Sequence, residues 1–432
     1  MEPTWGLGID FGTSGARAIA LAPTHEICAQ AQVSLTEQTS EAWQAALLEL
    51  LYQLPLEVRS RLQRIAINGT SATVLLCDRA GVPVAAPLLY NDDRGAAVLE
   101  AVRAIAPPQH PVISATSSLA KLLWWEAQGW GKSWGSASTP YYLLHQADWL
   151  AFQLHGKLGV SDYHNALKLG YDVGTLGYPA WLRQRESAIW LPQVVAPGRA
   201  IAPLIPALAT ALAIPHTCQI CAGTTDSIAA FLASGASETG EAVTSLGSTL
   251  VLKLLSQTRV DDARYGIYSH RLGDRWLVGG ASNTGGAVLR QFFSDAELTT
   301  YSQQIDPSQP SPLSYYPLPR PGERFPLCDP DLAPQLEPRP ADPVAFLAGL
   351  LEGMARIEAL GYQRLQALGA SPLRRVLTAG GGAQNQAWQA VRSRHLHLQV
   401  EVSPQTAAAY GSALLALGQW SGSGAREWSE EL

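Results

Sequence analysis

Residues 6–21, near the start of the chain, have the pattern of a β-hairpin with a polar tip. Leu7, Ile9 and Phe11 alternate with other residues as in a strand, and residues 16–21 form an apolar segment suited to the returning strand. The turn between the two strands consists of small and hydroxyl-bearing residues, namely Gly12, Thr13, Ser14 and Gly15. The stretch therefore predicts two antiparallel strands joined by a tight turn.

This turn has the groups that bind a metal-bound phosphate. Its glycines let the backbone approach a ligand closely, its N–H and hydroxyl groups can donate hydrogen bonds, and Asp10 adds a carboxylate at the mouth of the hairpin. A single hairpin of this kind is as often an ordinary turn whose polar groups satisfy their own backbone. Residues 242–254 repeat the design, however, around a turn of Gly247, Ser248 and Thr249. Two such hairpins predict a clamp on a polyphosphate.

Two common phosphate-binding motifs are missing from the sequence. A Walker A loop needs Gly-x-x-x-x-Gly-Lys-Ser/Thr before a helix, and a dinucleotide fingerprint needs Gly-x-Gly-x-x-Gly between a strand and a helix. Neither pattern occurs in the chain. The two hairpins are therefore the candidate phosphate site.

Length and composition indicate a globular protein of two domains. The 432 residues exceed one ordinary core, and 47% of them are hydrophobic while 15% are charged. A net charge of −6 disfavours non-specific nucleic-acid binding, and small molecules are the expected partners. No apolar run approaches the roughly 20 residues that span a bilayer, and the first strand leaves no room for a signal peptide. With five scattered cysteines, we expect a cytoplasmic protein without a disulfide framework.

A candidate catalytic carboxylate follows a buried strand in the middle of the chain. Residues 218–223 have a strand pattern, residues 228–234 an apolar helical one, and Asp226 lies between them. An Asp at this place is most often an ordinary helix N-cap. A helix N-terminus also favours the ionised form, so Asp226 is a candidate to accept a hydroxyl proton.

Polar residues after two other segments are candidates to bind an alcohol substrate. Ser71 follows a buried strand that begins at residue 64, and Asn91 and Asp92 follow an apolar segment together with Asp93 and Arg94. Each group has a simpler interpretation, a Ser/Thr turn for the first and a helix cap for the second. Two further features, the lone His164 and the Cys218/Cys221 pair, are interpreted as structural.

A glycine-rich turn near the end of the chain is a candidate adenosine site. Residues 374–380 have a strand pattern that runs into three glycines, and residues 383–393 have a helical one. Gly381 and Gly382 let the backbone lie flat against a base. Asn385 and Trp388, one helical turn apart, are candidates to flank adenine, although a Trp packed for structural reasons is the simpler interpretation.

Taken in order, these motifs resemble the FGGY carbohydrate kinases. The resemblance covers essentially the whole chain and rests on four motifs. These are Asp-Phe-Gly-Thr-Ser-Gly at 10–15, Ala-Gly-Thr-Thr-Asp-Ser at 222–227, Leu-Gly-Ser-Thr at 246–249 and Ala-Gly-Gly-Gly-Ala-Gln-Asn at 379–385. It implies an α/β fold of two actin-like (ribonuclease H-like) domains, of the actin, hexokinase and Hsp70 superfamily, with the ligands in a cleft between them. The implied domains are residues 1–234 with 409–432, on the sugar side, and residues 235–408, on the nucleotide side.

The resemblance also implies a role for each candidate residue. Asp226 would be the catalytic base, and Asp10 would orient Mg²⁺, through water, together with ATP. The implied phosphate-binding residues are Gly12, Thr13, Ser14, Gly15, Gly247, Ser248 and Thr249. The implied adenosine-binding residues are Gly381, Gly382, Asn385 and Trp388. The implied sugar-binding residues are Asp10, Ser71, Asn91, Asp92 and Asp226.

Two further segments suggest the sugar. Residues 67–78 and 163–171 resemble the short cyanobacterial and plant-chloroplast sugar kinases, which are xylulose kinase-like and associated with D-ribulose. Xylulose kinases usually carry a Gln-Met-His type of sequence where this chain has Thr70, Ser71 and Ala72. We therefore expect phosphorylation of D-ribulose, with D-xylulose as the alternative ketopentose.

Two alternative functions without a sugar substrate remain. The first is an actin-like ATPase or nucleotide switch, which would need no base on a sugar side. The second is a catalytically idle regulator, which the presence of both Asp10 and Asp226 disfavours. The sequence gives no indication of the oligomeric state.

Overall fold

The computed structural model describes residues 4–131 and 140–418. They form two compact units. Unit 1 contains the described residues up to Ala233 and those from Ala407 onward, and unit 2 runs from Ser234 to Thr406. The predicted domain that ends in 409–432 includes residues 419–432, which lie outside the described part of the chain. No helix in the described part is both long and apolar enough to cross a bilayer.

The centre of unit 1 is a six-stranded sheet with the order β10-β11-β4-β1-β2-β3. Its strands are β1 (Trp5–Phe11), β2 (Gly15–Leu21), β3 (Ile27–Ser34), β4 (Leu62–Gly69), β10 (Ala200–Pro203) and β11 (Gln219–Thr225). The strands β1, β4 and β11 are parallel, and each remaining strand is antiparallel to its neighbour. The hairpin predicted at residues 6–21 is confirmed as β1 and β2.

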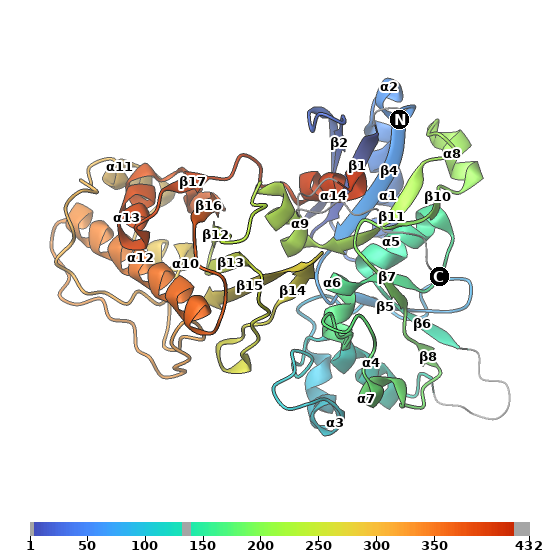
Figure 1. Ribbon diagram of the computed structural model, residues 1–432, viewed down its shortest axis with the longest axis horizontal. Helices are drawn as coiled ribbons and strands as arrows, with labels where there is room; N and C mark the ends of the chain where they lie inside the picture. Colours follow the sequence, from blue (N-terminus) through green and yellow to red (C-terminus); the bar gives the residue numbers. More distant parts are fainter. Residues whose placement is uncertain (1–3, 132–139, 419–432) are drawn as a thin grey trace. The chain divides into compact units, whose positions relative to one another are not determined.

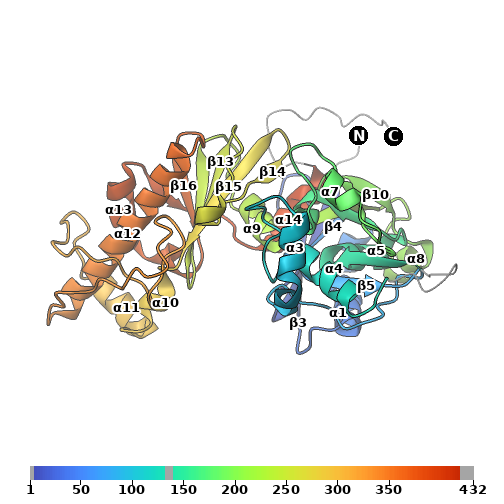
Figure 2. The ribbon, with the colours of Figure 1, turned by 90° about the horizontal axis from the view of Figure 1, so that it is seen from below.

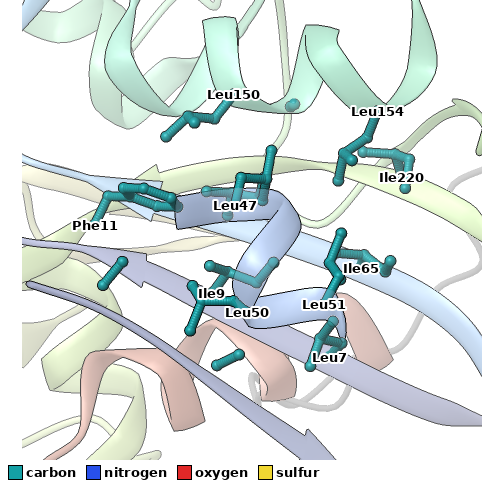
Figure 3. Close-up of a cluster of buried hydrophobic side chains, with 14 of the residues drawn as sticks. Leu7, Ile9, Phe11, Leu47, Leu50, Leu51, Ile65, Leu150, Leu154 and Ile220 are labelled. Carbon is teal, nitrogen blue, oxygen red and sulfur yellow. The ribbon is translucent and has the colours of Figure 1, made fainter. Parts of the chain in front are cut away.

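One face of this sheet is covered by α1 (Ser40–Gln53) and α5 (Gln146–His155). The alternating residues Leu7, Ile9 and Phe11 of β1 point to this side because side chains in a strand alternate between faces. They meet leucines of both helices in a fully buried cluster (Figure 3). The helix α1 is capped by Thr39, whose hydroxyl accepts a hydrogen bond from the N–H of Ala42.

The other face of the sheet is covered by α9 (Asp226–Ala233) and α14 (Ala408–Leu417) (Figure 1). The helix α14 lies so close to its neighbours that only glycine fits at two contacts. A Cβ atom on Gly8 would lie 2.0 Å from the carbonyl oxygen of Ala409, and one on Gly411 would lie 1.8 Å from that of Ala229. The last described helix is therefore an integral part of unit 1, next to the strand that carries Asp10.

Residues between β4 and β11 add a second core to unit 1. A small sheet of β5 (Val74–Cys77), β6 (Tyr141–His145) and β8 (Ile189–Trp190) packs with α3 (Leu99–Ile105), α4 (Ser118–Ala127) and α7 (Ala180–Arg183) (Figure 1). The other elements of unit 1 are α2 (Leu56–Arg59), α6 (Tyr163–Ala166), α8 (Pro206–Leu212), β7 (Val160–Asp162) and β9 (Gln193–Val195). This second core supports the segments after β4 that carry Ser71, Asn91 and Asp92.

Unit 2 is built on a second six-stranded sheet, with the order β14-β15-β13-β12-β16-β17. Its strands are β12 (Glu241–Leu246), β13 (Leu250–Ser256), β14 (His270–Leu272), β15 (Arg275–Ser282), β16 (Arg375–Ala379) and β17 (Val400–Val402). Its helices are α10 (Gly286–Leu289), α11 (Asp295–Ser302), α12 (Pro343–Ala367) and α13 (Gln386–Leu396). The long α12 and the shorter α13 pack side by side in this unit (Figures 1 and 2).

The two sheets repeat one strand topology. In unit 1 an antiparallel meander, β1-β2-β3, continues through β4 and β11, which add in parallel beside β1. In unit 2 the meander β12-β13-β15 continues in the same way through β16 and β17 beside β12. The two predicted phosphate turns lie at the equivalent place, the tip of the first hairpin. This is the duplicated actin-like, ribonuclease H-like α/β architecture that the resemblance implies.

Candidate active site

In unit 1 the candidate catalytic carboxylates lie at the carboxyl ends of two parallel strands, β1 and β11, which flank β4. Asp10 in β1 and Thr224 in β11 are both in register with Asn68 of β4, which lies between them. Asp226 follows two residues after Thr224, as the first residue of α9. Its carboxylate accepts a hydrogen bond of 2.6 Å from the N–H of Ser227. The fold thus brings together two acidic residues that are 216 positions apart in the sequence.

The environment of Asp10 raises the pKa of its carboxyl group. Burial, and next the negative charge of Asp226, raise the pKa of Asp10 from 3.8 to about 6, whereas the charge of Arg17 lowers it. Arg17 is an exposed residue of β2, directly opposite Asp10 in the hairpin register. Asp10 is therefore mostly ionised at neutral pH, but it becomes protonated in a mildly acidic solution.

Buried hydrogen bonds fix the strand ends next to these carboxylates. Asn68 is fully buried and donates to the carbonyl of Ile9 at 3.3 Å and to the hydroxyl of Ser412 in α14 at 2.7 Å. The imidazole of His164 forms a 2.7 Å hydrogen bond to the hydroxyl of Thr224, two residues before Asp226. His164, interpreted from the sequence as a lone structural histidine, therefore supports the strand end that precedes the candidate base.

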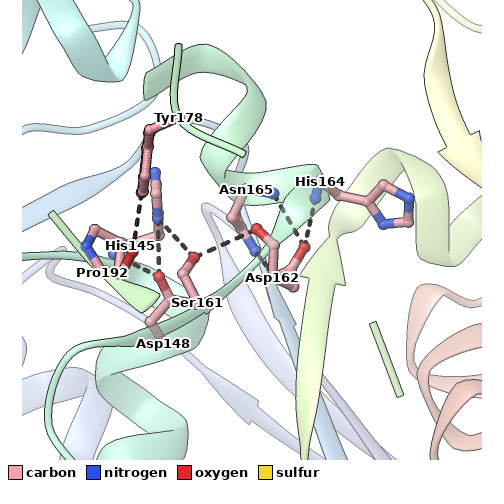
Figure 4. Close-up of polar contacts among 8 residues, drawn as sticks. All are labelled: His145, Asp148, Ser161, Asp162, His164, Asn165, Tyr178 and Pro192. Carbon is pink, nitrogen blue, oxygen red and sulfur yellow. Dashed lines mark hydrogen bonds and ion pairs between the residues drawn. The ribbon is translucent and has the colours of Figure 1, made fainter. Parts of the chain in front are cut away.

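His164 is itself held by a buried polar network (Figure 4). Asp162 accepts hydrogen bonds from the backbone N–H groups of His164 and Asn165, at 2.8 and 3.0 Å. Burial and the nearby Asp148 raise the pKa of Asp162 to about 7. The adjoining contacts of His145 with Asp148 and Ser161 both use Nδ1. In a catalytic triad one ring nitrogen of the histidine binds the carboxylate and the other binds the nucleophile. Here a single nitrogen contacts both groups, so we interpret this cluster as structural.

The candidate alcohol-binding residues lie on two segments of unit 1. Ser71 is half-buried in the turn after β4, and Asn91 is exposed. Asp92 forms an ion pair of 2.6 Å with Arg94. Burial alone would raise the pKa of Asp92, but the hydrogen bonds and charge of Arg94 hold it below the usual value. Asp92 therefore remains ionised, with part of its carboxylate already bound to Arg94.

A buried lysine that was not singled out from the sequence ties these two segments together. Lys121 of α4 is fully buried, and its amine donates to the carbonyl of Ala72 at 2.8 Å and to that of Leu89 at 2.5 Å. Burial lowers the pKa of Lys121 to about 7, with the charge of Asp92 opposing the effect. Lys121 is thus a cross-link between the turn of Ser71 and the segment that precedes Asn91.

The first phosphate turn is exposed at the tip of the hairpin. The N–H of Gly12 donates to the carbonyl of Gly15 at 3.0 Å, which closes the turn. The carbonyl of Thr13 accepts a hydrogen bond from Gln38 at 2.7 Å, and that of Ser14 accepts one from the N–H of Leu35 at 3.1 Å. These carbonyls are bound within the protein, whereas the side chains of Thr13 and Ser14 are exposed. The turn therefore presents donor groups to the solvent.

Unit 2 contains a pocket of about 970 Å³ that joins the second phosphate turn to the glycine-rich turn. Gly247 and Ser248 line it at one place, and the candidate adenosine residues line it at another, namely Gly381, Gly382, Asn385 and Trp388. The helix α11 supplies further lining residues, among them Ser302. Thr249 is a neighbour of the pocket in sequence but not one of its lining residues. The volume is within the range of small-molecule sites in proteins.

Asn385 and Trp388 differ from their predicted arrangement. Residues Gly381–Gln384 form a 3-10 turn, so the helix predicted at 383–393 begins only at Gln386. Asn385 is the cap of that helix. Its side-chain oxygen accepts a hydrogen bond from the N–H of Trp388 at 2.9 Å, and its side-chain NH₂ donates one to the hydroxyl of Ser302 at 2.8 Å. Trp388 is 2% exposed and belongs to the core, so it forms a wall of the pocket rather than an open stacking surface.

The segment before α10 also differs from the prediction. From residues 287–293 of the sequence we expect a helix, with Asn283 as its cap or as a neighbour of the nucleotide. The helix is shorter, Gly286–Leu289, and Asn283 instead binds the carboxylate of Glu323 and the carbonyl of Gly322. Arg290, at the end of this helix, lines the pocket and was not singled out from the sequence. Arg290 belongs to no short sequence motif, so the sequence alone does not mark it as a binding residue.

Comparison with known proteins finds similarity to carbohydrate kinases. Residues 242–420 match the sequence profile of the C-terminal domain of the FGGY family of carbohydrate kinases. Over 95% of its length the chain is 21% identical to a xylulose kinase of Staphylococcus xylosus, of which the match covers 90%.

Solved structures of two kinases share the fold. A xylulose kinase from Brucella ovis superposes with a TM-score of 0.82 at 23% identity, covering 96% of this chain and 90% of that one. A glycerol kinase from Plasmodium falciparum, solved with ADP, superposes with a TM-score of 0.79 at 16% identity, covering the same shares of the two chains. These solved structures show the fold that the chain shares with them, and the profile match links residues 242–420 to the C-terminal domain of the FGGY family.

Proposed function

We propose that the protein is a carbohydrate kinase of the FGGY family, and that it transfers the γ-phosphoryl group of ATP to D-ribulose and forms D-ribulose 5-phosphate. The observation that carries the proposal is that Asp10 and Asp226 lie at the ends of β1 and β11, the two strands on either side of β4 in unit 1. The 5-hydroxyl oxygen of the sugar forms a bond to the γ-phosphorus while the bond from that phosphorus to the bridging oxygen breaks. The hydroxyl proton passes to the carboxylate of Asp226, and ADP leaves.

The nucleotide part of the proposal rests on the pocket of unit 2. A Cβ atom on Gly381 would meet open space, so this residue leaves room for a flat base, whereas Gly382 lets the turn pack against Trp388 and Leu246. Ser248 offers a hydroxyl to phosphate oxygens. With Gly247 and Thr249 it forms the second of the two phosphate turns, and the first is Gly12 to Gly15. The glycerol kinase with the same fold was solved with ADP, which supports a nucleotide in this pocket.

Magnesium fits the proposed arrangement. Mg²⁺ in kinases is usually held by one or two carboxylates, by water and by the phosphates of the substrate. Within residues 4–131 and 140–418, no group of three or more His, Cys, Asp or Glu side chains is arranged as a complete metal site. A partly buried Asp10 with Asp226 nearby supplies the one or two carboxylates needed, and the ion would neutralise phosphate charge in the transition state.

The acceptor is the finer part of the proposal. D-Ribulose is supported by the resemblance of residues 67–78 and 163–171 and by Thr70, Ser71 and Ala72 in place of a Gln-Met-His type of sequence. D-Xylulose is the competing substrate because two of the relatives are named xylulose kinases. All five cysteines are free thiols, which supports the cytoplasmic location proposed for this small-molecule enzyme.

The test is ADP release from Mg-ATP by the full-length protein, first without sugar and then with D-ribulose, D-xylulose, L-ribulose or glycerol. Stimulation by D-ribulose well above that by the other acceptors is the expected result. A preference for D-xylulose would correct the substrate and leave the carboxylate roles intact. A rate that no acceptor changes would favour an actin-like ATPase or nucleotide switch and refute the role of Asp226.

Replacing Arg17 by methionine is expected to shift the acid limb of the pH profile of kcat/KM to higher pH. The positive charge of Arg17 lowers the pKa of Asp10, so its loss lets that pKa rise above about 6. Because Asp10 acts in its ionised form, activity should begin to fall at a higher pH as the solution is acidified. Arg17→Lys keeps the charge and should keep the wild-type limb, and an unchanged limb in the methionine variant would contradict the role of Asp10.

Replacing Lys121 by methionine is expected to raise KM for the sugar severalfold while KM for ATP stays within twofold. The change leaves the carbonyls of Ala72 and Leu89 without a buried donor, at a cost of about 1–3 kcal/mol for each. The turn that holds Ser71 is then no longer tied to the segment before Asn91. Steady-state kinetics with each substrate varied in turn measure the two effects, and equal increases in both KM values would show that the residue has only a general structural role.

A further inference from the structure

Arg290 lies against the second phosphate turn inside unit 2. Its guanidinium donates a 3.0 Å hydrogen bond to the hydroxyl of Ser248. The same group lies over the backbone of Gly286, where a Cβ atom would be 3.6 and 3.7 Å from its two terminal nitrogens. A Cβ atom on Gly286 would also lie 2.9 Å from the carbonyl oxygen of Gly247, so a glycine at this place lets the start of α10 approach the turn. The charged end of Arg290 is thus held at the wall of the pocket that carries Ser248.

The backbone around Arg290 is fastened to the same turn. The N–H of Gly286 donates to the carbonyl of Gly247 at 2.9 Å, and the N–H of Ala287 donates to that of Ser248 at 3.1 Å. Gly285 has φ +144°, and a Cβ atom there would lie 2.7 Å from the carbonyl oxygen of Ser248. The two segments therefore keep their mutual position, and the arginine stays next to Ser248.

Arg290 is one of two charged residues among the described residues that line the pocket, and the other is Asp295. The hydrogen-bond partner of Arg290, the hydroxyl of Ser248, is neutral. The guanidinium is also exposed, so a ligand can reach it without breaking a buried ion pair. An exposed cation beside a phosphate turn suits an anionic ligand.

We propose that Arg290 binds the β- or γ-phosphate oxygens of the nucleotide, side by side with the hydroxyl of Ser248. The proposal rests on the proposed function, because it needs ATP in the pocket of unit 2. A planar guanidinium donates two parallel hydrogen bonds to a phosphate, and these charge-assisted bonds are stronger than those between neutral groups. Arg290 would therefore make the pocket selective for nucleoside di- and triphosphates over adenosine.

The test is calorimetric titration of the full-length protein with ATP, ADP, AMP and adenosine, comparing wild type with Arg290→Met. We expect the Kd for ATP to rise by roughly tenfold to a hundredfold, as for the loss of a hydrogen bond to a charged group, while the Kd for adenosine stays the same. A loss shared by ATP and ADP would assign the contact to the β-phosphate. A loss confined to ATP would assign it to the γ-phosphate.

Two further variants separate this contact from other causes. Arg320→Met removes the same charge from an exposed residue of unit 2 that is not part of the pocket, and should leave all four Kd values unchanged. Arg290→Lys keeps the positive charge but lacks the planar guanidinium that donates two parallel hydrogen bonds. It should recover part of the affinity for ATP. Equal losses for ATP and adenosine, or no loss for either, would refute the role of Arg290. Failure of the wild type to bind any of the four ligands would instead refute the nucleotide site itself.

Discussion

Asp226→Asn is expected to lower kcat for sugar phosphorylation by about 10³-fold while the Kd for ATP stays near that of the wild type. Such a loss corresponds to about 4 kcal/mol of transition-state stabilisation. The amide keeps the shape of the side chain and can still accept a hydrogen bond from the N–H of Ser227. It cannot accept the proton of the sugar hydroxyl. Steady-state kinetics with the preferred sugar and calorimetric ATP binding measure the two quantities.

A matched control variant shows whether Asp226→Asn lowers kcat through the loss of a base or through a weaker cap at the start of the helix. Asp342 caps the N-terminus of α12 and accepts a hydrogen bond of 3.0 Å from the N–H of Val344. Asp342→Asn changes the same functional group at the start of another helix and should leave kcat unchanged, since asparagine is also a good cap. If Asp226→Asn retained kcat within about threefold of the wild type, Asp226 would not be the base.

The pH profile gives a second check on the same pair of carboxylates. The charge of Asp226 is one of the causes that raise the pKa of Asp10. Removing that charge should lower the pKa of Asp10 in the Asp226→Asn variant, and NMR titration of Asp10 can follow this without any need for activity. An unchanged titration of Asp10 would mean that the two carboxylates do not interact in solution.

The local features of the fold were predictable from the sequence. The hairpin β1–β2 was predicted because apolar residues alternate on both sides of Gly12 to Gly15, and its repeat β12–β13 follows from the same signal. The amphipathic helices were recognised in the same way, although the ends of some differ by a few residues. These signals act over short distances in the chain, which is why they can be recognised without the fold.

Contacts between distant residues were not predictable. Lys121 bonds to carbonyls 49 and 32 positions earlier, and Arg290 bonds to Ser248, 42 positions earlier. Neither residue belongs to a periodic pattern or a short motif, so their partners emerge only from the packing. Trp388 was expected as a possible partner of adenine, but the depth of its burial depends on the neighbouring helix and sheet. Sequence reasoning therefore named the loops of the candidate site better than the side chains that support them.

Arg392→Met is expected to destabilise unit 2 by about 3–5 kcal/mol, since it leaves a charged partner buried. Arg392 of α13 is 1% exposed and forms two hydrogen bonds, of 2.6 and 2.7 Å, with Glu358 of α12, which is fully buried. It also donates to Thr378 of β16, and Glu358 accepts from Thr244 of β12. The pair thus joins both helices to the sheet. Differential scanning calorimetry should show the transition of unit 2 lowered by roughly 10 °C.

Two variants make this result specific. Arg375→Met removes an arginine that is 40% exposed and forms ion pairs with Glu401 and Glu241, neither of which is fully buried. It should cost about 1 kcal/mol or less. Adding Glu358→Leu to Arg392→Met removes the unpaired buried charge and should recover part of the lost stability. A double variant less stable than Arg392→Met would contradict a penalty that arises from that charge.

The same substitution should weaken the nucleotide site. The first turn of α13 lines the pocket through Trp388, and Arg392 anchors this helix one turn later. ATP binds folded unit 2, so saturating ATP should raise the transition temperature of the wild type. In Arg392→Met the increase should be smaller, because a loosened α13 holds the pocket less well. An equal increase in both proteins would show that the ion pair stabilises the core without supporting the pocket.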